Sequence, residues 1–407
     1  MKPGSSLSNI LLGLLIAYRV LVSFIPALGY YSPTSINIAS VLLLYVLVFS
    51  MMGIQKSLRT LGRYLPLFFM LIVDLLFGYQ GKMSSLAVFV YLIMQALLWP
   101  LLVEGLKAGD YRKLARNILV LIVISYIITS VTTIVGNIAY PGASRALARL
   151  AAQDDAETAY MYQSFNIGGV EFVYQLVLLV PLLIYVIRCS KFWGKLLAVA
   201  ILVIFAAVIY ISEYTTALIF ALLAFILFLI PKGFSSKQLL RMGIVVALIA
   251  FVLVYVIDIF SIVSNLVEGS GVAERLQDVS NMVHGKKIDS SGDLDARGSL
   301  WSESVNNFLS SPIWGTGKSG GHSYLLDHLG MFGLIGALLQ YVLFKKMNVL
   351  AIRPYKGSPF YITLLVVFLM ELGLTMFNAY THIVIFTVVI PLFCYVFSPK
   401  NTINDNV

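Results

Sequence analysis

RGSLWSESVNNFLSSPIWGTGKSGGHSYLLDHLGMFGLIG, residues 297–336, is a polar, glycine-punctuated segment in a chain that otherwise consists mainly of apolar runs. It starts at an arginine, passes through a short amphipathic stretch and a glycine-rich turn, and enters an apolar run at His322. Long irregular connections are usually functional. We therefore take this segment as the candidate working part of the chain and the apolar runs as its scaffold.

The composition is that of a membrane protein. Of the 407 residues 59% are hydrophobic and 12% are charged, and the mean hydropathy is +0.91, whereas a soluble domain carries roughly 25% charged residues. The first apolar run, residues 7–25, is long enough to span a bilayer, and no small-residue cleavage site follows it, so we expect no signal peptide. The two cysteines, Cys189 and Cys394, do not indicate a disulfide framework or a metal–thiolate site.

Runs of spanning length predict an all-α polytopic membrane protein with about 12 transmembrane helices. We expect residues 1–407 to form a single membrane domain. Two of the predicted helices are separated by only Ser212 to Tyr214, and the last pair could divide differently around Asn378. The predicted helices cover residues 7–25, 36–54, 61–77, 84–104, 116–136, 169–188, 194–211, 214–231, 239–262, 323–343, 360–377 and 379–397.

Lysine and arginine predict the orientation of these helices. One set of short alternate loops, together with both termini, holds 19 of the 28 basic residues. The positive-inside rule therefore places both termini in the cytoplasm, and it explains the net charge of +9 without a nucleic-acid partner. Two long loops, residues 137–168 and 263–322, fall on the extracytoplasmic side. A pore or a simple carrier has little need of such loops, whereas an enzyme that acts at the outer leaflet does.

The second long loop contains a predicted amphipathic helix, about residues 297–309, which starts at Arg297 and ends before Pro312. Such a helix is expected to lie at the membrane interface with its apolar face toward lipid or toward the other helices. From these residues alone, a solvated arginine on a surface helix is an equally good interpretation of Arg297. The apolar positions are Leu300, Trp301, Val305, Phe308 and Leu309.

Glycines surround Lys318 after this helix. They allow the backbone to approach a ligand closely, but a tight turn into the membrane would need them too. Lys318 does not complete a phosphate-binding P-loop, because the glycine spacing differs and no hydroxyl-plus-helix pattern follows. Further glycines at Gly330, Gly333 and Gly336 are expected to let another helix pack closely.

His322 stands at the start of the next predicted helix. A histidine there can donate a hydrogen bond or act as a base near neutral pH, or it can simply cap the helix. No HxxxH or HExxH pattern accompanies it. The sequence therefore predicts no metal site and no cofactor.

The first long loop carries Arg145 and Arg149, four residues apart and on one face if residues 143–152 are helical. Two guanidinium groups on one face suit a phosphate or pyrophosphate. Pairing with the acidic residues that follow, Asp154, Asp155 and Glu157, explains them equally well.

Ionisable residues also fall within predicted helices. In a transporter they would relay protons or ions, and in an enzyme they would support a polar cavity. Arg19 is a candidate partner for one of the acids, but the sequence does not pair it. The residues are Arg19, Asp74, Glu171, Glu371 and His382.

The order of these motifs resembles the O-antigen polymerase and ligase superfamily of bacterial polysaccharide assembly. In the second loop the resemblance rests on Arg297-Gly-Ser-Leu-Trp, Phe308-Leu-Ser-Ser-Pro312, Trp314-Gly-Thr-Gly317, His322-Ser323-Tyr324 and residues 330–336. In the first loop, Ala143-Ser-Arg145-Ala-Leu and Asn166-Ile-Gly-Gly169 are most similar to Wzy-type repeat-unit polymerases of capsule and exopolysaccharide. Ser323 stands where many relatives have asparagine.

This resemblance implies a GT-C-like, metal-independent membrane glycosyltransferase at the extracytoplasmic face of the bacterial plasma membrane. Its donor would be an undecaprenyl-pyrophosphate-linked oligosaccharide, and a chain-length regulator would be a further partner. The catalytic residues implied are Arg145, Arg297 and His322. Candidate substrate-binding residues are Arg149, Asn166, Lys318 and Tyr324, although a family role for Arg149 stays open.

Three functions remain open at this point. The leading one is polymerisation of lipid-linked repeat units, which the stretch 166–174 and the modest loops favour. A ligase of the same superfamily would use the same donor with another acceptor. A flippase or ion-coupled transporter would explain the many spans and the buried acids, but not two long loops that carry arginine and histidine.

Overall fold

The computed structural model describes residues 6–77, 86–150, 156–225, 293–378 and 381–397, with a few residues between 261 and 281. Every regular element in these ranges is helical. The predicted helix 239–262 and most of the loop before residue 293 lie outside the described residues. The chain divides into two compact units, which we describe separately. Unit 1 comprises residues 1–169, 338–356 and 382–407, and unit 2 comprises residues 170–337 and 357–381.

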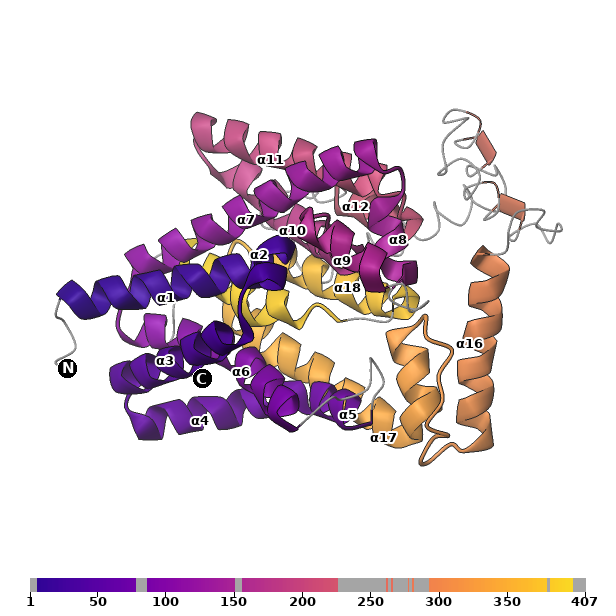
Figure 1. The fold of residues 1–407 in the computed structure, drawn as a ribbon, viewed down its shortest axis with the longest axis horizontal. Coiled ribbons are helices and arrows are strands. Elements are labelled where there is room, and N and C mark those ends of the chain that lie inside the picture. The colour runs from indigo at the N-terminus through magenta and orange to yellow at the C-terminus, as the bar shows by residue number, and fades with distance from the viewer. Residues whose placement is uncertain are drawn as a thin grey trace. The chain divides into compact units, whose positions relative to one another are not determined.

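Unit 1 is built from the N-terminal helices and closed by the C-terminal one. Helix α1 packs on α7 and α3, α3 packs on α6, and α19 packs on α7 and α6 (Figure 1). Pro26 starts α2 at a position where a missing backbone N–H costs nothing. Its elements are α1 (Ser6–Phe24), α2 (Pro26–Tyr31), α3 (Thr34–Met52), α4 (Ile54–Tyr64), η1 (Leu65–Phe68), α5 (Phe69–Phe77), α6 (Leu86–Ala108), α7 (Arg112–Ala139), α8 (Ala143–Leu150), α9 (Ala156–Ser164), the end of α17 (Tyr324–Met347), η3 (Asn348–Ile352), η4 (Arg353–Tyr355), η5 (Ile385–Val389) and α19 (Ile390–Phe397).

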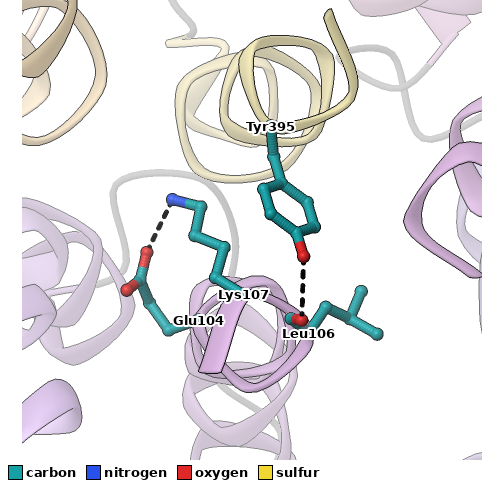
Figure 2. A network of polar contacts seen from close by, with 4 residues as sticks. All are labelled: Glu104, Leu106, Lys107 and Tyr395. Atoms are coloured by element: carbon teal, nitrogen blue, oxygen red, sulfur yellow. Dashed lines mark hydrogen bonds and ion pairs between the residues drawn. The ribbon is translucent and has the colours of Figure 1, made fainter. Parts of the chain in front are cut away.

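Polar contacts fasten α19 to the turn between α6 and α7. The Tyr395 hydroxyl donates to the Leu106 carbonyl at 3.4 Å, beside the Glu104–Lys107 ion pair of 2.8 Å (Figure 2). The same hydroxyl lies 3.3 Å from Asp110 Oδ1, and Arg112 Nε donates to the Tyr395 carbonyl at 3.0 Å. The bond from Arg112 satisfies a carbonyl in the last turn of α19, where carbonyls lack partners within the helix.

Unit 2 is organised around α10 (Val170–Cys189), whose side chains are almost all buried or half-buried. It packs on α11 (Phe192–Ile211), α12 (Thr215–Phe225) and α18 (Tyr361–Phe377). The unit also contains α16 (Asp293–Ser310) and the first part of α17. The predicted break between α11 and α12 is confirmed, and Glu213 makes the turn with a positive φ of 56°.

Six helices in the described ranges are long and apolar enough to cross a membrane. Four shorter apolar helices accompany them: Ile10–Phe24, Thr215–Phe225, Tyr361–Phe377 and Ile385–Phe397. The prediction of a helical, multi-pass membrane protein is confirmed at this level, whereas the full number of spans and the GT-C-like arrangement stay predictions. The six are Thr34–Met52, Val90–Ala108, Arg112–Ala139, Val170–Cys189, Phe192–Ile211 and Tyr324–Tyr355.

Two sequence-based expectations need correction. Residues 323–343 do not form one continuous helix, because Gly333 breaks α17 with φ 57° and ψ −142°. Glu171 lies within the candidate span Val170–Cys189 as expected, but it is exposed in the first turn of α10 rather than buried, and Gln175 donates to it at 3.2 Å. Arg19 and Glu371 are buried, as their apolar surroundings suggested.

Replacing Tyr395 with Phe tests how α19 is held. The change removes the bonds to Leu106 and Asp110 while keeping the ring, so we expect the free energy of unfolding to fall by about 1 kcal/mol. Thermal unfolding of the purified protein in detergent measures it. Tyr341→Phe is the matched control, because that side chain is exposed. Equal effects of the two substitutions would contradict the role of the Tyr395 hydroxyl.

Candidate functional site

The first long loop is folded rather than open. Helix α7 continues to Ala139, and residues 143–164 form α8 and α9 in the described part of the loop. A small apolar core joins these helices to the chain that follows them, with Tyr162 packed against it. The core consists of Ala143, Leu147, Ala159 and Ile167.

Side chains near the end of α7 hold both ends of this folded loop. Asn137 bonds the start of α8 twice: its Nδ2 donates to Ser144 Oγ at 2.7 Å and its Oδ1 accepts from Ser144 N at 3.2 Å. Thr133 Oγ1 accepts from Gly168 N at 2.8 Å. Ile167 packs against Gly136, where a Cβ would come within 2.5 Å of its side chain. The loop is therefore fixed on α7 at its entry and at its exit.

Asn166, a predicted substrate-binding residue, is buried at this exit with a positive φ of 59°. Its Oδ1 accepts from Ala27 N at 3.2 Å, and its Nδ2 donates to Thr132 Oγ1 at 2.9 Å and lies 3.3 Å from Thr129 Oγ1. Both ends of the amide thus bind the protein itself. The structure shows Asn166 joining α1–α2, α7 and the loop, while a contact with substrate stays a prediction.

The arginines of this loop lie on α8. The predicted helix 143–152 is confirmed over Ala143–Leu150, and it carries Arg145 and Arg149 one turn apart. Arg145 is half-buried and interacts with other residues of the chain. The side chain of Arg149 lies outside the description. A short helix fixed by its own core is a rigid support for a guanidinium group that binds an anion.

The predicted amphipathic helix of the second loop is confirmed as α16, Asp293–Ser310, four residues longer at its start. The apolar residues of α16 do not all lie on its buried side. Val305 and Leu309 are exposed, whereas Ser304 is 0% exposed and Trp301 packs on Phe377 of α18 at a ring distance of 5.7 Å. The side chain of Arg297 lies outside the description.

A buried carboxylate organises the connection from α16 to α17. Asp327, 0% exposed, accepts three hydrogen bonds: Ser304 Oγ at 2.6 Å and Gly321 N at 3.1 Å on Oδ1, and Ser323 N at 3.0 Å on Oδ2. Ser304 Oγ in turn accepts from Gly320 N at 2.9 Å. The charge is satisfied entirely by groups that it draws together, as burial of a carboxylate requires.

Backbone pairing holds the rest of the connection against the break in α17. Thr316 N donates to Gly330 O at 2.9 Å and Gly317 N to Met331 O at 3.0 Å. Leu334 N, freed by the break, donates to Pro312 O at 2.8 Å. At Gly333 an added Cβ would lie 2.5 Å from that same Pro312 oxygen. The break in the helix therefore supplies the groups that the connecting segment pairs with.

Glycines bring α16 close to this connection. A Cβ on Gly320 would lie 2.1 Å from Leu300 O, and one on Gly330 would lie 2.8 Å from Ser304 O. The prediction that Gly330 allows close helix packing is confirmed, since Ser304 belongs to α16. Gly333 has a different role from the predicted one: it breaks the helix.

His322 is exposed and lies between Gly321 and Ser323, whose N–H groups both bond Asp327. It does not cap α17, since the Ser323 hydroxyl accepts from Leu326 N at 3.3 Å and fills that position. Its backbone position is thus fixed on both sides while its side chain faces outward. An imidazole held in this way can accept a proton from a hydroxyl group or orient it.

The two predicted substrate-binding residues of unit 2 differ in exposure. Lys318 is exposed at the glycine turn, and its carbonyl accepts from Asn307 Nδ2 at 3.4 Å. Tyr324 is only 2% exposed. Its N–H donates to Asn378 O at 2.8 Å, and its carbonyl bonds His328 Nδ1 at 2.6 Å. Lys318 can reach a ligand directly, whereas Tyr324 supports the start of α17.

The structure therefore collects the predicted residues into two sets. Arg145, Arg149 and Asn166 share the folded loop of unit 1. Lys318, His322 and Tyr324 share the connection in unit 2 that follows α16, which carries Arg297.

Sequence reasoning missed Asp327 and Ser304 as the residues that fix this connection. The spacing Ser323-x-x-x-Asp327 at the start of a helix is close to a capping box and could have indicated the role of Asp327. No sequence signal distinguished Ser304 from the other polar residues of α16.

Replacing Asp327 with Ala tests the organising role of the carboxylate. Three donors would lose their acceptor, so we expect the free energy of unfolding to fall by about 3 kcal/mol or more. We also expect faster amide hydrogen exchange over residues 317–323. Glu303→Ala is the control, because Glu303 is an exposed acid on α16, next to Ser304. Unchanged exchange in the Asp327 variant would contradict the assignment.

A pair of glycine substitutions separates backbone strain from steric fit. Gly333→Ala and Gly321→Ala both place a side chain at positive φ, but only the first meets backbone atoms, at 2.5 Å. We expect Gly321→Ala to cost about 1 kcal/mol and Gly333→Ala clearly more. Denaturant unfolding of both variants measures the difference, and equal costs would show that the contact with Pro312 is not tight.

Comparison with known families agrees with this part of the structure. Residues 200–332 match the family model described as O-antigen ligase. The match contains α16, the connection and the first part of α17, with Arg297, His322 and Asp327, whereas Arg145 precedes it. No curated protein is significantly similar to the chain. The match confirms the resemblance found in the sequence: this chain is a multi-pass membrane protein that carries a region of the O-antigen polymerase and ligase superfamily.

Proposed function

We propose that the protein is a Wzy-type polymerase of undecaprenyl-pyrophosphate-linked oligosaccharide repeat units. One observation carries the proposal: the segment matched to the O-antigen ligase family contains the connection that exposes His322 on a fixed backbone. A glycosyltransferase needs such a positioned base, because the acceptor hydroxyl must lose a proton as it attacks. The exposed Lys318 beside it supplies positive charge.

The proposed reaction moves the growing glycan onto the incoming unit. A sugar hydroxyl oxygen of the incoming unit attacks the anomeric carbon of the donor glycan, and the hydroxyl proton passes to His322. The bond between that carbon and the pyrophosphate oxygen breaks, and its electron pair leaves with the pyrophosphate. Arg297 is assigned to the charge that develops there, because positioned cations stabilise it without a metal.

Arg145 and Arg149 are assigned to pyrophosphate binding on unit 1. Both belong to α8, which its own core and Asn137 hold in place. A polymerase handles two lipid-linked substrates, so it has two pyrophosphate groups to bind. Asn166 is assigned to supporting this loop through its bonds to Ala27 and Thr132. We place this face outside the plasma membrane, with both termini in the cytoplasm, on the distribution of basic residues.

A ligase is the second candidate, because the matching family model carries that description. It would use the same donor and the same His322, but its acceptor would be another glycan or a protein. The described residues do not favour either acceptor. The acceptor requirement therefore has to be measured.

Incubation of the purified protein with one lipid-linked repeat unit separates these functions. A polymerase should form a ladder of products without added divalent metal, whereas a ligase should need a different acceptor. A flippase would form no product in detergent and would instead move the unit across a vesicle membrane. Failure to form any transfer product with either acceptor would contradict the proposal.

Substitutions then test the residue roles. We expect His322→Ala and Arg297→Ala to lower kcat by about 10²- to 10⁴-fold. In cells, single lipid-linked units should then accumulate on the outer face. Arg59→Ala is the control, since Arg59 is exposed on α4 at the predicted cytoplasmic side and should leave activity unchanged. Accumulation on the cytoplasmic face would favour the flippase instead.

A further inference from the structure

Arg19 is a buried cation in an apolar helix of unit 1, and part of its side chain is unsatisfied. It is 1% exposed and lies in α1, close to the end of that helix at Phe24. Its Nη1 donates to Asn37 Oδ1 at 3.2 Å. Its Nε and Nη2 are buried and have no hydrogen-bond partner within the described ranges. Because unpartnered buried donors are costly, above all on a cation, these two nitrogens indicate an acceptor that the described residues do not supply.

The two unpartnered nitrogens form one edge of the guanidinium group. The N–H bonds of Nε and Nη2 run side by side, and this edge matches two oxygens of a phosphate or carboxylate group. Asn37 holds the opposite side of the group through Nη1. Asn37 therefore holds Arg19 through Nη1, while the forked edge has no acceptor within the described ranges.

The neighbours of Arg19 add further donors. Asn37 Oδ1 also accepts from Tyr18 Oη at 3.0 Å and from Ser32 Oγ at 3.0 Å. Three groups thus lie within hydrogen-bonding distance of an oxygen that has two lone pairs, so at most two of them donate to it at once. Tyr18 and Ser32, which also bond each other, are half-buried and so connect the cluster to the surface of unit 1. A cluster with surplus donors and one crowded acceptor is completed by a negatively charged ligand with several oxygens.

The cluster lies at the same end of unit 1 as the folded loop with Arg145. Helix α2 follows α1 directly and packs on α9, and Ala27 N bonds Asn166. Arg19 lies roughly 8 Å below the end of α1, taking 1.5 Å per residue. The basic residues predict that this end is extracytoplasmic. An arginine at this depth lies where the phosphate groups of lipids meet the apolar layer.

We propose that the cluster of Tyr18, Arg19, Ser32 and Asn37 binds a phosphate or pyrophosphate group where the apolar layer of the membrane ends on the extracytoplasmic side. Nε and Nη2 of Arg19 donate to two oxygens of one phosphate, and the hydroxyl of Tyr18 or Ser32 that does not donate to Asn37 reaches a third. A phosphate suits the cluster better than a carboxylate, which has only two oxygens. The identity of the lipid, a polyprenyl pyrophosphate, rests on the proposed function. The need for an anion does not rest on it.

Equilibrium binding to the full chain in nanodiscs of phosphatidylcholine tests the proposal. The probes are undecaprenyl pyrophosphate without sugar and inorganic pyrophosphate. We expect Arg19→Met to weaken binding of the lipid roughly 10- to 100-fold. Arg19→Lys, which keeps the charge without the fork, should weaken it roughly 3- to 10-fold. Arg112→Met is the matched control, because Arg112 bonds the Tyr395 carbonyl and not this cluster.

The two probes distinguish the sources of the phosphate. Tight binding of the lipid with competition by inorganic pyrophosphate supports a lipid occupant, and equal binding of the inorganic ion supports a soluble one. Thermal unfolding in the same nanodiscs shows whether Arg19→Met folds, and Arg19→Lys decides if it does not. Lipid binding by Arg19→Lys as tight as in the unchanged protein would overturn the proposal. Because no sugar is transferred, failure of the proposed polymerase activity would leave this result unaffected.

Discussion

The connection between α16 and α17 depends on the burial of one carboxylate. A charged group removed from water is stable only when donors replace its hydration. Asp327 obtains them from Ser304 on α16 and from the backbone of Gly321 and Ser323. The same carboxylate therefore fixes the position of α16, the path of the turn and the start of α17. It also fixes the backbone of His322, because the N–H groups of both neighbouring residues bond Asp327.

The same segment also requires residues without side chains, so that its backbone can lie close to α17. The connection pairs with carbonyl groups of α17 near the break, at Gly330 and Met331. A Cβ at Gly315 would come within 2.1 Å of the Met331 oxygen, so the connecting segment could not lie there with a larger residue at this position. Such close packing suits a membrane protein, in which helices associate through contact of small residues rather than through exclusion of water. The glycines of the turn therefore determine the shape of the site, while Asp327 determines its attachment.

The sequence predicted the helices of the described ranges well, because a span must be apolar over its whole length and that signal is local. It predicted α16 but left open whether the apolar residues face lipid or the other helices. In the structure Val305 and Leu309 are exposed, Trp301 packs on α18 and Ser304 makes the buried bond. The helical period alone did not divide these residues between the two sides.

The same limit applies to the site. Glycine, arginine and histidine were recognised from their spacing, but the partners of Asp327 and the break at Gly333 arise from contacts between segments. Nothing in residues 323–343 alone separates a straight helix from a broken one, because Gly330 and Gly336 look the same in the sequence. The break becomes necessary only when the Pro312 carbonyl needs the N–H of Leu334. The hydrogen bond between these two segments therefore determines the break, and the spacing of apolar residues in the sequence could not predict it.

Two buried charges of opposite sign, one in each unit, show how the chain treats charge away from water. Asp327 is surrounded by donors from its own chain and needs nothing else. Arg19 has one bond to Asn37, and its other two nitrogens have no partner within the described residues. A chain that only had to remain folded would satisfy both charges, or would place an apolar residue at one of them, because an unpaired buried cation lowers stability. Within the described residues the anion has its donors and the cation lacks two acceptors, and the binding of an anion at Arg19 would supply them.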